Sequence, residues 1–216
     1  MRTIPCPGRW LLSAIAVALL GACATLNESE CRSGDWRQIG YTDGLKGRPS
    51  SRFAEHQKAC GEYGIAAEEI GWKLGYAEGQ ALYCTADNGY LQGRNGNGYA
   101  DVCPPATDRL FRPAYDDGRR VFEQRVHLDE VIRQLKDIGG RLAEDDRRSR
   151  DYLDAVRDGR TPPNKPQLLG RDERERLERE YARLDRDYAE SLARIERADA
   201  DLSARYAVAP ANYRDR

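Results

Sequence analysis

The sequence lacks the common catalytic signatures. HExxH, GxSxG, P-loop and dinucleotide-binding patterns are all missing from its 216 residues. Of its two histidines, His127 stands alone in a charged segment, and His56 is accompanied only by a cysteine four residues later. We therefore expect a protein that is not an enzyme and that binds neither a metal ion nor a cofactor.

Long apolar runs and an excess of one charge are also missing. The run from Trp10 to Leu20 falls well short of the about 20 apolar residues that a membrane-spanning helix needs. Lys and Arg number 35 and Asp and Glu 36, so a nucleic-acid partner is not expected. Charged residues make up 33% and mean hydropathy is -0.80, which predicts a modest core and a long solvated surface.

The N-terminus has the order of a secretion signal. Two arginines precede the apolar run, and small residues follow it. Residues 20–23, Leu-Gly-Ala-Cys, resemble a bacterial lipobox, which implies that residues 1–22 are removed and that Cys23 carries lipid. Two or three acyl chains would hold the chain stably on a membrane. By resemblance to Gram-negative lipoproteins, Ala24 rather than Asp after the cysteine implies sorting to the outer membrane, facing the periplasm.

The mature chain would keep four cysteines besides the lipidated one. An even number in an exported chain predicts two disulfides, because the periplasm is oxidising. Their spacing matches neither a zinc ribbon nor a CxxC redox pair, and three connectivities are open. Each bridge would contribute about 2–4 kcal/mol by restricting the unfolded chain. The candidates are Cys31, Cys60, Cys84 and Cys103.

A Gly-Tyr-x-x-Gly pattern recurs through the first half of the chain. It occupies residues 40–44, 75–79, 89–93 and, as a relic, 114–118. Glycines at i and i+4 share one helical face, which predicts short helices approached closely by another backbone. For the glycines of 87–89 and 95–98, turns are the favoured interpretation.

The same region is dense in aromatic residues. Aromatic faces beside Asp and Asn suit sugar or peptide ligands, so a binding site for cell-wall glycan or peptidoglycan is one interpretation. The other is that these rings form the core of a domain with few other large apolar residues. The candidate binding residues are Trp36, Tyr41, Trp72 and Tyr76.

These cysteines, glycines and aromatic residues resemble those of a known family. Asp35-Trp36, Gly75 with Gly79, Tyr83-Cys84 and Val102-Cys103-Pro104 are similar to the bacterial lipoproteins grouped as domain of unknown function 2799. The resemblance extends over roughly residues 23–120. It implies export and disulfides, and it brings no activity with it.

The second half predicts an antiparallel helical hairpin. Apolar residues recur at heptad spacing over 128–156 and 177–202, on either side of a proline-rich turn near 159–168. Aligning the two patterns places Asp145 opposite Leu184. The alternative is that the same heptads pair with another chain. The dense mixed charges predict solvated helix faces.

We therefore expect a mainly α protein, with a small disulfide-bonded helical domain followed by a long, coiled-coil-like hairpin. Its expected parts are a signal peptide (1–22), the cysteine-rich domain (23–107), the hairpin (108–206) and a flexible tail (207–216). The function expected is that of a non-enzymatic cell-envelope lipoprotein with a structural or protein-interaction role, its partners being the membrane and an envelope protein. A binder of cell-wall glycan or peptide is the alternative.

Overall fold

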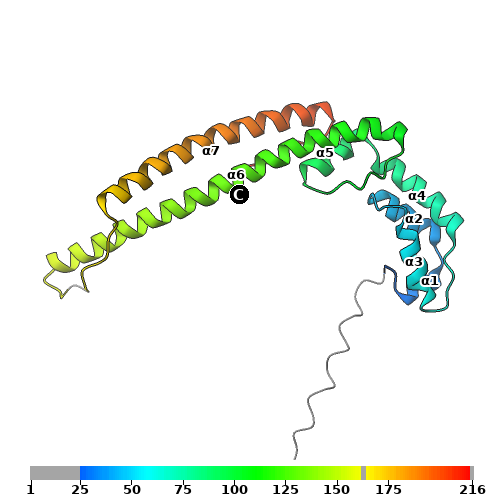
Figure 1. The fold of residues 1–216 in the computed structure, drawn as a ribbon, viewed down its shortest axis with the longest axis horizontal. Coiled ribbons are helices and arrows are strands. Elements are labelled where there is room, and N and C mark those ends of the chain that lie inside the picture. The colour runs from blue at the N-terminus through cyan, green and yellow to red at the C-terminus, as the bar shows by residue number, and fades with distance from the viewer. Residues whose placement is uncertain (1–24, 162–163, 215–216) are drawn as a thin grey trace, which may run out of the picture. The chain divides into compact units, whose positions relative to one another are not determined.

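The fold is helical throughout the part of the chain that the structure, a computed structural model, describes. These residues are 25–161 and 164–214 (Figure 1). The expected signal peptide and Cys23 lie outside them. Every regular element within the described ranges is a helix, and none of these helices is long and apolar enough to cross a membrane. The mainly α prediction is confirmed.

The chain divides into two compact units. The first contains the residues up to Tyr83 together with 100–102, and the second contains 84–99 and the residues from Cys103 onward. The expected cysteine-rich domain over 23–107 is therefore split. The sequence gives no composition change at residue 84, because both sides of this boundary carry the same glycine and aromatic pattern.

The first unit is built from four short helices. They are α1 (Glu28–Ser33), α2 (Trp36–Leu45), α3 (Arg52–Gly61) and α4 (Glu69–Tyr83). The Asp35 side chain caps α2 by accepting a hydrogen bond from the backbone N–H of Gln38. The core is mostly aromatic and contains Leu26, Cys31, Trp36, Phe53, Cys60, Trp72 and Tyr76.

Helices α2 and α4 lie parallel with their backbones in contact. A Cβ added to Gly75 would lie 1.8 Å from the Arg37 carbonyl oxygen, and one added to Gly44 would lie 2.2 Å from that of Tyr76. Real Cβ atoms cannot approach backbone this closely, so only glycine fits. The expectation of close backbone packing at the Gly-Tyr-x-x-Gly patterns is confirmed for this pair.

The second unit repeats this arrangement and then extends it. Helix α5 (Ala86–Arg94) packs against the start of α6 (Pro105–Arg157), and α7 (Arg171–Arg205) follows. A Cβ on Gly93 would lie 2.1 Å from the Tyr115 carbonyl oxygen, and one on Gly118 would lie 2.2 Å from that of Tyr90. The four patterns thus form two helix pairs, one in each unit.

The two pairs share further details. Gly47 lies directly on the ring of Tyr83, just as Gly96 lies on the ring of Phe122. Each unit also holds one disulfide. The turn expected at 87–89 is wrong, because these residues are helical, whereas 95–98 follow the end of α5 with Gly96 at a φ of 78°. Both units therefore contain one version of the same parallel helix pair.

The four cysteines form two disulfides, as predicted. Cys31 is bonded to Cys60 and Cys84 to Cys103, with Cα–Cα distances of 5.5 and 5.6 Å. In each unit the bridge joins the segment before the first helix of the pair to the segment before the second. The connectivity that the sequence left open is therefore the sequential one.

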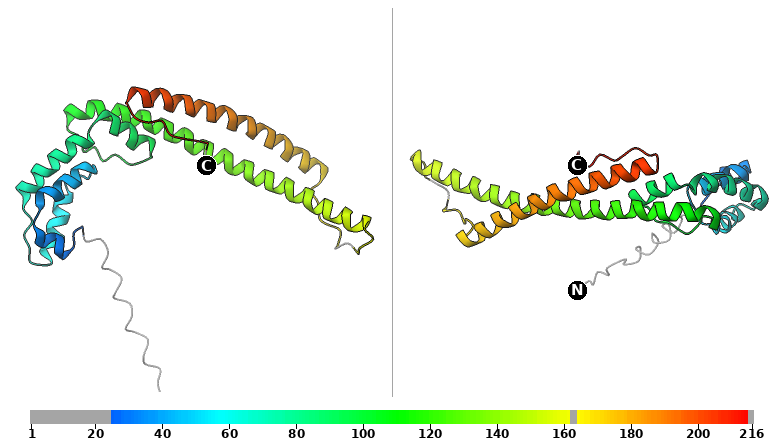
Figure 2. Two further views of the ribbon diagram at one scale, coloured as in Figure 1. Left: turned by 180° about the vertical axis from the view of Figure 1, so that it is seen from behind. Right: turned by 90° about the horizontal axis from the view of Figure 1, so that it is seen from above.

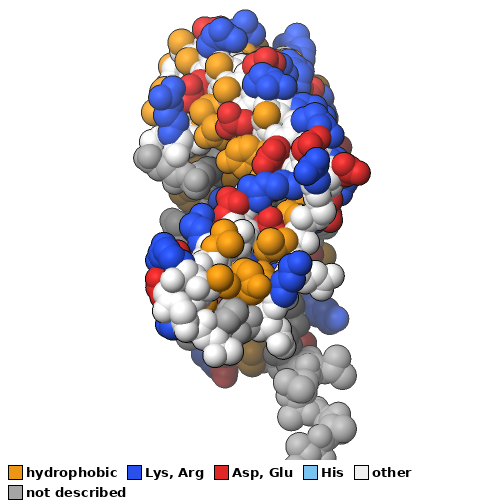
Figure 3. Space-filling view, turned by 90° about the vertical axis from the view of Figure 1, so that its left-hand side faces the viewer, with side chains coloured by type: hydrophobic (Ala, Val, Ile, Leu, Met, Phe, Trp, Pro, Cys, Tyr) orange, Lys and Arg blue, Asp and Glu red, His pale blue; other side chains and the backbone are white. Residues whose placement is uncertain are grey.

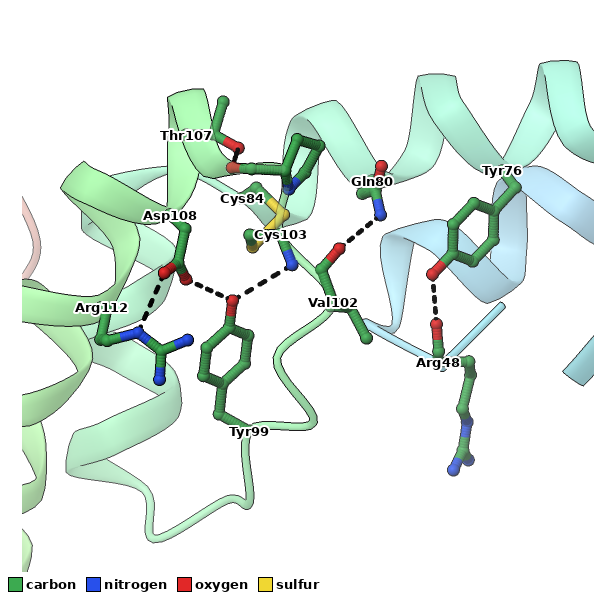
Figure 4. The surroundings of a disulfide bond; sticks show 11 residues. Arg48, Tyr76, Gln80, Cys84, Tyr99, Val102, Cys103, Thr107, Asp108 and Arg112 are labelled. Carbon is green, nitrogen blue, oxygen red and sulfur yellow. Dashed lines mark hydrogen bonds and ion pairs between the residues drawn. A yellow bond between two sulfur atoms is a disulfide. The ribbon is translucent and has the colours of Figure 1, made fainter. Parts of the chain in front are cut away.

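The second disulfide is flanked by a hydrogen-bonded tyrosine (Figure 4). The Tyr99 hydroxyl donates to the Asp108 carboxylate at 2.6 Å and accepts from the backbone N–H of Cys103 at 3.1 Å. Burial, reinforced by the Asp108 carboxylate, raises the pKa of Tyr99 to about 12. In turn the Tyr99 hydroxyl lowers the pKa of Asp108.

Tyr99 is expected to ionise late in an alkaline titration. Its folded-state pKa exceeds the unfolded value of about 10, so the stabilisation is complete below about pH 10 and is lost as the pH rises through about 12. Phenolate absorbance of folded and urea-unfolded protein measures the effect. Tyr99→Phe should remove one tyrosine from those that ionise at high pH. If the number of tyrosines that ionise at high pH does not change, Tyr99 is not one of them.

Helices α6 and α7 form the antiparallel hairpin (Figures 1 and 2). Apolar side chains from both helices fill the space between them. Near the connection the buried residues are Val131, Ile138, Leu177 and Leu184. The predicted hairpin is thus present within one chain.

The register of the hairpin differs from the prediction. The Asp145 carboxylate, expected opposite Leu184, accepts hydrogen bonds from Arg174 at 2.8 Å and from the Leu169 backbone N–H at 2.7 Å. Helix α7 is therefore displaced by about ten residues, nearly three turns. The prediction took the turn to be symmetric. In the structure, residues 164–170 run back along α6, whose last turns extend past the start of α7 (Figure 1).

Cross-linking of cysteines distinguishes the two registers. In Gly139→Cys/Tyr181→Cys a short thiol cross-linker should join the helices within one chain, because a Cβ on Gly139 would lie 3.2 Å from the Tyr181 ring. The predicted register instead brings residues 139 and 190 together. In Gly139→Cys/Glu190→Cys the cross-linker should not join the helices, because residue 190 lies about 13 Å further along α7 than residue 181. Equal yields, or preferred linkage of the second pair, would contradict the observed register.

The C-terminal segment is folded, contrary to the expected flexible tail. Tyr213 is buried, and the backbone N–H of Ala211 donates to Asp199 at 2.6 Å. Arg214 forms an ion pair with Glu196 on α7 at 2.6 Å. The sequence of 207–214 has no regular pattern, so the prediction missed this packing.

Candidate functional site

A partly buried polar cluster links Thr25 to three helices of the first unit. We call Thr25, Asp43, His56 and Trp72 the Thr25 clamp. The Thr25 hydroxyl lies 2.6 Å from Nδ1 of His56, whose Nε2 lies 2.8 Å from the Asp43 carboxylate. The same carboxylate oxygen accepts a hydrogen bond from the Trp72 indole N–H at 3.0 Å.

Three different helices position the clamp. Asp43 projects from α2, His56 from α3 and Trp72 from α4. His56 is only 2% exposed and Asp43 8%. An ionised Asp43 accepts from both the indole and the imidazole Nε2–H, so Nδ1 is left to accept the Thr25 hydroxyl proton. The Thr25 hydroxyl, both imidazole nitrogens and the indole N–H therefore each have a partner within the clamp.

The order hydroxyl, imidazole, carboxylate is also that of a nucleophile relay. Such a relay needs a cleft where substrate meets the hydroxyl and an oxyanion-stabilising group. Two clefts of the described residues are lined by hairpin side chains, and neither includes a residue of the clamp. The hydrogen bonds of the clamp bind the segment that contains Thr25 to the rest of the first unit.

The residues after Thr25 are fixed as well. Leu26 is buried in the core, and Asn27 caps α1 in a reciprocal capping box with Glu30. Cys31 follows and is bonded to Cys60 on α3. Residues 25–31 are therefore attached to the first unit by polar, apolar and covalent contacts in turn.

The proposed aromatic binding residues are mostly core residues. Trp36, Trp72 and Tyr76 are buried, with the Trp72 and Tyr76 rings stacked at 4.7 Å. Tyr41 alone of the four is partly exposed. A glycan site formed by all four side chains is thus not available on the surface, because a small domain without many aliphatic residues uses its aromatic residues as core.

Two shallow clefts run along the hairpin. One of about 350 Å³ is lined by Arg120, Glu123, Gln124, His127, Ser191 and Arg194. The other, about 540 Å³, lies between residues 130–141 and 176–180. Both have mixed charges, and no group of three or more His, Cys, Asp or Glu side chains in the described ranges could hold a metal ion. The clefts follow from the spacing of two helices with long charged side chains.

A second buried polar cluster was missed by the sequence analysis. Asp199 on α7 is fully buried and accepts hydrogen bonds from Tyr90 and, at 3.2 Å, from Arg94, both on α5. Arg94 also donates to the Ala209 carbonyl at 2.8 Å. The cluster ties α5, α7 and the C-terminal segment together. Acidic residues are frequent in this part of the sequence, and most of them are exposed. Only the position of Asp199 next to Ala198 in the heptad pattern could have indicated that it is buried.

One family model matches part of the chain. Residues 35–120 match the family model described as Protein of unknown function (DUF2799). The resemblance predicted from the sequence is confirmed over this segment. The DUF2799 segment includes both glycine-packed helix pairs and most of the Thr25 clamp, and it ends within α6. No curated protein and no solved structure matches the chain.

Proposed function

We propose that this chain is a non-enzymatic cell-envelope lipoprotein whose hairpin binds another envelope protein. It is cut before Cys23, lipidated there and held at the outer membrane, facing the periplasm. Two disulfides with ordinary Cα–Cα distances support an oxidising compartment. The lipobox-like residues 20–23 support the anchor.

The observation that carries the interaction role is the end of α6. Because α7 begins opposite Asp145, the last turns of α6 have no α7 residues beside them, and hydrophobic side chains gather at this end of the hairpin (Figure 3). Leu153 is 61% exposed and Val156 52%. Apolar residues at i and i+3 on a helix face that α7 does not cover suit the groove-binding mode by which a partner helix docks.

Photo-cross-linking in cells tests this role. A benzoylphenylalanine at position 153 should form an adduct with one defined envelope protein. The same residue at position 200, on an exposed part of α7, serves as the control and should not. Adducts at both positions, or at neither, would contradict a partner specific to the end of α6.

Fractionation of cells producing Cys23→Ser tests the anchor, because this variant should leave the membrane fraction.

A further inference from the structure

We propose that the Thr25 clamp removes any flexible tether between lipid and protein, so that the first unit lies directly on the phospholipid headgroups with α1 against them. This inference rests on the proposed lipidation of Cys23 and adds a surface and an orientation to it. The contacts that fix the chain from Thr25 onward, and the short covalent path back to Cys23, support it.

The path from the clamp to the lipid is short. Consecutive Cα atoms are 3.8 Å apart, so Thr25 lies within about 8 Å of Cys23 whatever the conformation of the intervening peptide. The headgroup layer is itself about 5–8 Å thick on each side of the bilayer. With acyl chains in the hydrocarbon, residue 23 lies at its boundary and Thr25 lies at most a few ångströms outside the headgroups.

The clamp transmits this restraint to the whole unit. Thr25 is bound to His56 on α3, and through Asp43 to α2 and α4. A chain that left Thr25 free would allow the unit to move away from the bilayer by the length of the loose segment. Here the chain is fixed from Thr25 onward, because Thr25 is hydrogen-bonded to His56, Leu26 is buried and Cys31 is covalently bonded to α3.

The surface nearest the chain entry suits headgroups. Helix α1 begins three residues after Thr25, and the exposed residues on it are polar. Glu28 and Arg32 form an ion pair at 2.7 Å, and Ser29 and Glu30 are also exposed. A face with carboxylates and a guanidinium but no exposed large apolar side chain matches zwitterionic phosphoethanolamine headgroups, which carry both ammonium and phosphate. It does not match insertion into hydrocarbon.

Fluorescence quenching by headgroup-labelled lipid tests the inference. The lipoprotein extracted from membranes is reconstituted into phosphatidylethanolamine and phosphatidylcholine vesicles that contain a lipid spin-labelled on its headgroup. A fluorophore on Ser29→Cys reports contact, and one on Ser33→Cys at the end of α1 provides a second site. The matched control carries twelve Gly and Ser residues inserted before Thr25, a tether with a root-mean-square length of about 20 Å.

Strong quenching at both positions, reduced at least about twofold by the inserted tether, is the expected result. Weak quenching that the insertion does not change, in protein whose Cys23 is lipidated by mass, would overturn the direct contact and leave the proposed anchor intact. Absence of lipid on Cys23 would overturn both.

Discussion

Gly118→Ala is expected to destabilise the second unit by about 3 kcal/mol or more, or to prevent its folding. The added Cβ would lie 2.2 Å from the Tyr90 carbonyl oxygen and 2.6 Å from the Arg94 backbone nitrogen. Both atoms belong to the backbone of α5 and cannot rotate away as a side chain would. The helices must separate, and the buried side chains between them lose contact.

Gly140→Ala in the same helix is the matched control. No atom lies within 4 Å of a Cβ built on Gly140, and its φ is not positive. This substitution should stabilise α6 by about 0.5–1 kcal/mol, since alanine is the better helix former. Urea unfolding should therefore shift the two midpoints in opposite directions. Similar shifts for both variants would contradict backbone contact between α5 and α6.

Asp199→Ala is expected to cost about 3–5 kcal/mol, because it leaves the Arg94 guanidinium partly buried without its carboxylate partner. Tyr90 and the backbone N–H of Ala211 lose their acceptor at the same time. The C-terminal segment should then become accessible to proteases before the hairpin unfolds. Urea unfolding and limited proteolysis measure the two effects.

A neighbouring acid provides the control for this prediction. Asp201 lies two residues further along α7 and is exposed, so Asp201→Ala should change stability by no more than about 0.5 kcal/mol. In Asp199→Ala/Arg94→Met the cost should be smaller than the sum of the single changes, because neither charge is left unpaired. Additive costs would show that Asp199 and Arg94 act independently.

Much of the fold could be predicted because its determinants are local. Gly-Tyr-x-x-Gly spacing identifies helix faces without side chains, and the structure places those faces in contact in both units. An even cysteine count predicted two disulfides. The pairing needed the structure, since the spacings of Cys31, Cys60, Cys84 and Cys103 are similar and each connectivity closes loops of ordinary length.

The register of the hairpin could not be derived from the heptads alone. Both helices carry apolar residues at intervals of three and four, so sliding one helix by about ten residues again brings apolar residues together. The connection decides between the registers. Where the connection returns to α6, the Asp145 carboxylate accepts a hydrogen bond from the Leu169 backbone N–H, and no hydrophobic pattern predicts a contact of this kind.

The Thr25 clamp was missed for a similar reason. Thr25, Asp43 and His56 are unremarkable in the sequence and lie on three different segments, and only the packing of α2, α3 and α4 brings them together. One signal was present: Asp43 lies between Gly40 and Gly44, on a helix whose glycines face another backbone. A carboxylate in that position must have buried hydrogen-bond donors beside it.

Mass spectrometry of the N-terminal peptide from membrane-extracted protein tests the central claim most directly. If the chain is a lipoprotein, the peptide begins at Cys23 and carries the mass of at least two acyl chains on that residue. A peptide that still contains residues 1–22, or a mature N-terminus with an unmodified Cys23, would contradict the anchor.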